Sequence, residues 1–146
     1  MMKRYTQRKR RGQVMIETAL VLAAVLLPLT VGILQFGIVL NATNTLTQIA
    51  REGARYASVH GTEANSDAAI RTYVRAVATG TSINSADLSD SRIDIAMVSG
   101  NARSSGNAIV VTLTYPMSKK VFIGSFFPYM TKLKQDYTAK STFVLE

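Results

Sequence analysis

The stretch that decides the fold is residues 10–40, RRGQVMIETALVLAAVLLPLTVGILQFGIVL. It begins with basic residues, passes through Gly12 and Glu17, and continues as 23 uncharged residues from 18 to 40. A helix of that length rises about 34 Å, which is enough to cross a hydrocarbon core of roughly 30 Å. The stretch therefore predicts a transmembrane helix with a carboxylate close to one end.

A cleaved secretory signal is the alternative interpretation of this span, and it would give a secreted soluble protein. The apolar region of a signal peptide usually has about 7–15 residues and ends at a small-residue cleavage site. The span here is longer, and Leu40, Asn41 and Ala42 match such a site poorly. The sequence therefore favours a retained span. Pro28 lies inside it and predicts a kink, because proline removes one helical hydrogen bond.

The basic charge of the chain is concentrated before the span. Residues 1–12 hold six of the 17 Lys and Arg residues and no acidic residue, whereas the remainder carries 11 basic and nine acidic side chains. The net charge of +8 therefore indicates a basic N-terminal segment, and nucleic acid is not an expected partner. Because basic flanks stay cytoplasmic, we expect residues 1–12 in the cytoplasm and the C-terminal part in the periplasm or outside the cell.

Glu17 needs an explanation, because a carboxylate inside a membrane costs about 2.5–3.5 kcal/mol on insertion scales. At the cytoplasmic end of the span, its carboxylate can reach the lipid headgroups. A functional interpretation begins with cleavage after Gly12, which would give Gln13 a charged amine one helical turn from Glu17. In an assembly of parallel helices, Glu17 of one subunit would then pair with the amine of its neighbour.

The basic segment, Gly12, Glu17 and the apolar helix together resemble the processing site of type IV pilins and pseudopilins. In that family a membrane-embedded aspartyl peptidase cleaves after the glycine, and the glutamate guides subunit assembly. The resemblance therefore implies prepilin peptidase cleavage between Gly12 and Gln13 and an assembly role for Glu17.

A second resemblance lies just after the span. Residues 49–57, IAREGARYA, resemble the A-R-E-G-A-R-Y-A signature of the TadE-like family, which are pseudopilin-like proteins of the tight adherence (Flp pilus) apparatus. Residues 33–37 are similar to that family's I-x-E-F-G, with Gln35 where a glutamate is common. The signature residues, which the resemblance marks as a candidate docking segment, are Ala50, Arg51, Glu52, Gly53, Ala54, Arg55 and Tyr56.

The TadE-like resemblance implies a location and partners. It places the protein in the bacterial inner membrane, with other pilin or pseudopilin subunits, the pilus assembly machinery and prepilin peptidase as partners. The implied function is biogenesis, priming or tip structure of a Flp-type (type IVc) adhesion pilus. The alternative is an unprocessed single-pass anchor that presents a small periplasmic binding domain in a secretion system.

The signature also has a helical period. Small and apolar residues recur on one face of a helix that continues beyond the span: Leu46, Ile49, Ala50, Gly53, Ala54 and Ala57. This face permits close approach of another backbone or sheet, and Gly53 needs such packing to offset its poor helix propensity. Arg51, Glu52 and Arg55 lie on the other side. Two interpretations of that side remain open: a solvated face with a weak Glu52–Arg55 ion pair, and a docking face for partner pilins.

The rest of the chain predicts a small soluble module. We expect Gly61 to cap the long helix, a second helix from Ser66 or Asp67 to Gly80, and a loop over 81–92. Three strands are expected, at 93–98, 108–115 and 138–145. The predicted fold is α+β and pilin-like, with a long N-terminal helix and a roughly three-stranded antiparallel sheet. Its parts are the basic segment 1–12, the helix 13–60 and the extracytoplasmic module 61–146.

Two further segments have open interpretations. Residues 119–130 are apolar and are favoured as a cover over the core, with a contact surface as the alternative. Asp87, Asp90 and Asp94 could converge on a calcium ion, but a solvated acidic loop is favoured because their spacing is not that of an EF-hand. We expect no metal, no cofactor and no catalysis, because His60 is the sole histidine, cysteine is absent and no catalytic motif occurs.

Overall fold

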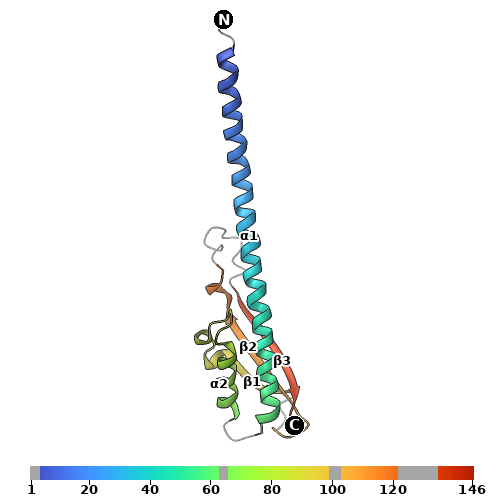
Figure 1. The fold of residues 1–146 in the computed structure, drawn as a ribbon. Helices are drawn as coiled ribbons and strands as arrows, with labels where there is room; N and C mark the ends of the chain where they lie inside the picture. The colour runs from blue at the N-terminus through green and yellow to red at the C-terminus, as the bar shows by residue number, and fades with distance from the viewer. Residues whose placement is uncertain (1–3, 63–65, 99–102, 122–134) are drawn as a thin grey trace. The chain divides into compact units, whose positions relative to one another are not determined.

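The computed structural model describes residues 4–62, 66–98, 103–121 and 135–146, and their side chains from Gly12 onward. The helices are α1 (Arg4–His60) and α2 (Ser66–Ala78), with single 3₁₀ turns η1 (Ser85–Asp87), η2 (Asp90–Arg92) and η4 (Met117–Lys119). The strands are β1 (Ile93–Met97), β2 (Ala108–Pro116) and β3 (Asp136–Val144). The predicted α+β fold, with its long N-terminal helix, a short helix and a three-stranded antiparallel sheet, is confirmed (Figure 1).

The chain divides into two compact units, 1–36 and 37–146. The first unit is the N-terminal part of α1. We expected the helix to begin at Gln13, but it begins at Arg4. Large apolar side chains are exposed around its whole circumference, as in a helix made for an apolar surrounding. Within the described residues, α1 is the one helix long and apolar enough to cross a membrane, with a mean hydropathy of 2.3 over its most apolar window. Pro28 lies inside it, and the kink stays a prediction.

The second unit contains the C-terminal part of α1, α2 and the sheet. β2 lies in the middle, paired antiparallel with β1 and with β3. The register aligns Leu113 of β2 with Ile93 on one side and Ala139 on the other, and all three are buried. These side chains belong to one apolar cluster with residues of both helices, so the helices and the sheet share a single core.

The predicted helical face of α1 is the part of α1 that enters this core. The side chains of this face are at most 1% exposed: Leu46, Ile49, Ala50, Ala54 and Ala57. α2 contributes Ile70, Val74 and Ala78, whereas its Tyr73 and Val77 are only partly buried. Small residues on α1 bring its backbone close to α2 and β2, which is how a thin three-stranded sheet obtains a closed core.

Two glycines after the helices have different roles. Gly80 follows α2 with φ +83°, the left-handed conformation expected of a helix-terminating glycine. Gly61 follows the end of α1 at His60, as expected, but without the left-handed conformation that is common at this position. Gly61 is needed for space instead, because a Cβ on it would lie 2.4 Å from the carbonyl oxygen of Ala57 and 2.6 Å from Cδ2 of Leu145.

The segment 81–92 is more ordered than the loop expected from its composition. It contains the turns η1 and η2, and it places Ile83 and Leu88 in the core at 2% and 0% exposure. Of the apolar segment 119–130, Val121 is buried at 4% exposure. The residues from 122 to 130 lie outside the described residues, so their role as core cover or contact surface stays a prediction.

Candidate processing and docking site

The three residues of the predicted processing site lie on consecutive turns of α1. Gly12, Gln13 and Glu17 are all exposed, and a Cβ added to Gly12 would meet no atom within 4 Å. Gln13 and Glu17 are four residues apart, which separates them by about 6 Å along the helix axis. The Gly12–Gln13 peptide bond is helical, so cleavage requires local opening, which the poor helix propensity of glycine favours.

The apolar helix that follows is suited to a membrane. Exposed side chains include Val14 at 59%, Leu27 at 66% and Phe36 at 60%. Gln35 is an exception, with 1% exposure at the position where the TadE-like family commonly has a glutamate. An exposed apolar surface of this length is not stable in water, so a lipid surrounding is the physical expectation.

The small residues of the signature are packed inside the chain's own module. Ala50 and Ala54 are fully buried, and a Cβ on Gly53 would lie 2.7 Å from Cγ2 of Val74 in α2 and 3.6 Å from Cγ1 of Val111 in β2. The Gly53 face is therefore occupied by α2 and β2. A partner subunit has access only to the other side of the signature.

That other side carries the charged residues of the signature. Arg51, Glu52 and Arg55 are exposed. The expected Glu52–Arg55 ion pair is not among the ion pairs of the described residues, which leaves these charges available to another molecule. Whether they dock on a partner stays a prediction.

Tyr56, the last signature residue, is the centre of an aromatic stack. Its ring lies 4.2 Å from the ring of His60, one turn later in α1, and 4.2 Å from the ring of Tyr73 in α2. The interplanar angles are 15° and 10°, so the three rings are nearly parallel. Nδ1 of His60 lies 3.2 Å from the carbonyl oxygen of Tyr56. The stack joins the two helices at the module surface.

A shallow depression of about 190 Å³ lies beside these rings. We name it the signature surface, and its lining residues are Glu52, Arg55, Tyr56, Val59, His60 and Tyr73. Val59 is 53% exposed, so the surface combines apolar and aromatic area with two opposite charges. Such a combination is typical of a protein contact surface.

Two of the three acidic residues weighed as a calcium site have partners within the described residues. Asp87 forms an ion pair with Nζ of Lys119 and accepts a hydrogen bond of 3.2 Å from the hydroxyl of Tyr115. Asp90 pairs with Arg75, and Asp94 is exposed on β1. Within the described residues, no group of three potential ligands is arranged to hold a metal ion.

The Asp87 cluster has perturbed titration. The hydrogen bond from Lys119 lowers the pKa of Asp87 below its ordinary value of 3.8, although burial acts in the opposite direction. Burial raises the pKa of Tyr115 above 10.0, and the neighbouring Asp87 adds to this effect. Both shifts favour the arrangement seen, with an ionised Asp87 and a neutral Tyr115. The contacts of Asp87 with Tyr115 and Lys119 join the η1 turn to the end of β2 and to the η4 turn that follows it.

Sequence reasoning missed the aromatic stack and the ion pairs. Tyr56 and His60 have helical i, i+4 spacing, a signal that could have suggested contact. Tyr73 lies 17 residues after Tyr56, and no local pattern in the sequence places the two rings side by side. The processing residues and the signature fall in different compact units of the chain.

The comparison with known families agrees with the signature. The family model described as TadE-like protein matches residues 12–55, beginning at Gly12 and ending within the signature. Neither the curated proteins nor the solved structures include a match to this chain. The matched residues include the predicted processing site, the candidate span and most of the signature. The resemblance predicted from the residues is thus confirmed: residues 12–55 match the TadE-like family, which is linked to Tad/Flp pilus systems.

Proposed function

We propose that this chain is a pseudopilin-like inner-membrane protein that acts in biogenesis, priming or tip structure of a Flp-type adhesion pilus, without catalysing a reaction. The observation that carries the proposal is the TadE-like match over 12–55, which joins a candidate processing glycine to a membrane-length apolar helix. The orientation, with the N-terminus cytoplasmic, is supported by the basic residues before the span.

Cleavage after Gly12 would create a positive charge that can pair with Glu17 of a neighbouring subunit. The new amine on Gln13 and the carboxylate of Glu17 would lie about 6 Å apart along the axis, so parallel subunits staggered by about one helical turn would bring the amine of one to the carboxylate of the next. A Glu17 carboxylate that enters a bundle of such helices finds a positive partner on its neighbour, which offsets the cost of removing it from water. The exposure of Gly12, Gln13 and Glu17 supports this arrangement.

The module would meet its partners through the signature surface. The Gly53 face is occupied internally, so contacts with other subunits fall to the charged side and the aromatic stack. Arg51, Glu52 and Arg55 have no ion-pair partner within the described residues, and each could pair across a subunit boundary. This arrangement would use the signature twice, with one side for folding and the other for docking.

Complementation in pilus-producing cells that lack the gene tests the proposal. The wild-type chain should restore surface pili and adhesion, and Gly12→Leu should not. Gly32→Leu is the matched control, because Gly32 also lies in α1 and has open space around its Cβ position. Full restoration by Gly12→Leu would contradict processing and favour the alternative, an unprocessed anchor with a small periplasmic binding domain.

A further inference from the structure

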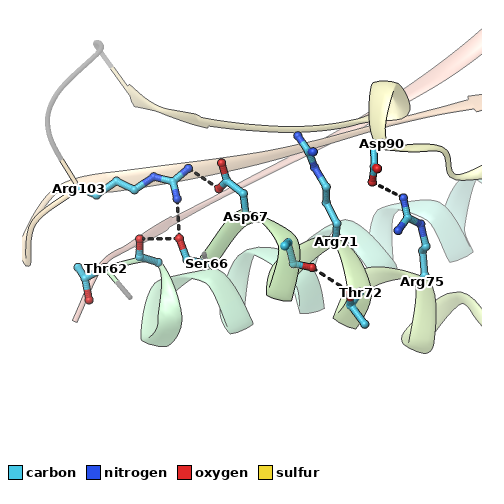
Figure 2. A pocket seen from close by; sticks show the side chains of 10 residues that line it. Thr62, Ser66, Asp67, Arg71, Thr72, Arg75, Asp90 and Arg103 are labelled. Atoms are coloured by element: carbon cyan, nitrogen blue, oxygen red, sulfur yellow. Dashed lines mark hydrogen bonds and ion pairs between the residues drawn. The ribbon is translucent and has the colours of Figure 1, made fainter. Parts of the chain in front are cut away.

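A groove of about 520 Å³ lies along α2, and it shares no lining residue with the signature surface. We name it the arginine groove. The charged side chains that line it are Asp67, Arg71, Arg75, Asp90 and Arg103 (Figure 2). Three of them, Asp67, Arg71 and Arg75, are spaced four residues apart and so follow one face of the helix.

Two of the three arginines already have partners. Arg103 donates to the hydroxyl of Ser66 at 2.6 Å and to the carboxylate of Asp67 at 2.5 Å. Arg75 donates from Nε to the carbonyl oxygen of Leu88 at 2.9 Å and pairs with Asp90. Each of these guanidinium groups is neutralised and held in place.

Arg71 is different. Its side chain stands between the two ion pairs in Figure 2, and no hydrogen bond or ion pair joins it to any described residue. Its Nε is fully removed from solvent and has no acceptor. The helical neighbour that would ordinarily pair with Arg71 is Asp67, four residues earlier, but that carboxylate is engaged by Arg103. A desolvated charged donor without an acceptor is unfavourable. Arg71 also lines the groove, so an acceptor that enters the groove and reaches this guanidinium would meet little competition from the described residues.

We propose that the arginine groove binds a carboxylate of another molecule, with Arg71 as the recognition residue. A guanidinium presents two parallel N–H donors that match the two oxygens of a carboxylate. The charge of the groove supports a monoanion, because three arginines and two aspartates leave one positive charge. A dianion such as phosphate would meet the carboxylates of Asp67 and Asp90 as well. This site goes beyond the proposed function, since it involves neither the span nor the signature surface.

The carboxylate can come from a small free acid or from an acidic side chain of a polypeptide. The full-length protein in detergent micelles, with ¹⁵N-labelled arginine, distinguishes these sources. The Nε–H signals are followed while acetate, inorganic phosphate or a blocked peptide with one Glu is added, and the same peptide with Gln is the control. We expect the Arg71 signal to shift and saturate with acetate and with the Glu peptide. At least tenfold tighter binding of the Glu peptide would identify a polypeptide as the source, and equal affinities would identify small acids.

Variants show whether Arg71 is responsible. Arg71→Gln should abolish the binding of acetate and of the Glu peptide. Arg71→Lys should weaken this binding about tenfold, because lysine lacks the two parallel N–H donors of a guanidinium. Lys140→Gln, at an exposed cation of β3 that lines neither the groove nor the signature surface, should bind as the wild type does, and thermal melting confirms that each variant is folded. A tighter response to phosphate than to acetate, or an unchanged Arg71 signal in every titration, would overturn the proposal. Glu63 lies outside the described residues, and Glu63→Gln tests whether its carboxylate is the partner of Arg71. A shift of the Arg71 signal in this variant without added ligand would also overturn the proposal, because Arg71 would then be paired within its own chain.

Discussion

Gly53 of α1 and Val74 of α2 approach so closely that a Cβ on Gly53 would lie 2.7 Å from Cγ2 of the valine. Real Cβ atoms essentially never show this distance. The glycine of the TadE-like signature is therefore a packing residue in this fold. It lets α1 and α2 approach each other, and it places Val111 of β2 in contact with the same helix position.

Gly53→Ala should destabilise the module although alanine is the better helix former. Helix propensity favours the change by about 1 kcal/mol, whereas overpacking costs typically about 1–3 kcal/mol. Val74 is β-branched and stiff in a helix, so the clash is not relieved by a simple rotation. Urea unfolding of the purified chain in detergent measures the difference.

A double-mutant cycle isolates this contact. Val74→Ala removes the clashing methyl, so Gly53→Ala should be better tolerated in that background, with a favourable coupling of about 0.5–3 kcal/mol. Gly37→Ala is the matched control, because its Cβ would meet nothing within 4 Å. Equal effects of Gly53→Ala and Gly37→Ala on unfolding would show that the close approach does not govern stability.

The Asp87 cluster predicts loss of stability in acid. The pKa of Asp87 in the folded chain is lower than the ordinary 3.8, mainly because of the hydrogen bond from Lys119. The folded chain therefore binds fewer protons than the unfolded chain as this group titrates. Its stabilising contribution is complete above the unfolded pKa and is lost as the pH falls through the folded pKa.

Asp87→Asn should flatten this part of the stability–pH curve, measured by urea unfolding between pH 2.5 and 6. The variant should also be less stable than the wild type at pH 6, because Lys119 and Tyr115 lose their anionic partner. Asp94→Asn, at an exposed position of β1, serves as the control and should leave the curve unchanged. Parallel curves for the wild type and Asp87→Asn would contradict this account of the cluster.

Tyr73→Leu should weaken the joint between α1 and α2. Leucine keeps most of the apolar area but removes the ring that stacks on Tyr56, and such aromatic pairs contribute about 0.5–1.5 kcal/mol beyond burial. Tyr137→Leu is a suitable control, since Tyr137 is 38% exposed on β3. An equal midpoint of unfolding for Tyr73→Leu and the wild type would show that the stack adds nothing to stability.

Much of the architecture follows from local patterns. The apolar run 18–40 predicts one long helix, and the small residues at positions 50, 53, 54 and 57 mark the face that packs. Turn-rich composition and alternation locate the three strands to within a few residues of their ends. These features depend on neighbours in the sequence, so they could be predicted without tertiary information.

The site geometry depends on contacts between distant residues, and these could not be predicted. Arg103 reaches Asp67, and Lys119 reaches Asp87, across 36 and 32 residues of sequence. The composition of residues 81–92 predicted a loop, but Ile83 and Leu88 are buried, so this segment forms part of the core. The end of α1 at Gly61 could be predicted locally, but the close approach of Leu145 to this glycine could not, because Leu145 lies at the far end of the sequence.

Glu17→Gln should separate processing from assembly. The amide removes the negative charge but leaves Gly12 and Gln13 intact, so the chain should still be cleaved and membrane-bound. Assembly should fail or slow, because the neighbour's new amine loses its partner. Immunoblots of sheared surface pili and of membranes measure both outcomes, with Asp94→Asn, at an exposed position of β1 outside the signature surface, as a charge-matched control. Normal incorporation of Glu17→Gln would show that this carboxylate does not guide assembly.

The most direct test of the proposed function is the intact mass of the chain extracted from membranes of its pilus-producing host. We predict a species that lacks residues 1–12 and begins at Gln13, and its loss either in cells without the prepilin peptidase or in Gly12→Leu. Gly32→Leu should be processed as the wild type is. A full-length chain in cells whose other pilins are processed would contradict the pseudopilin assignment.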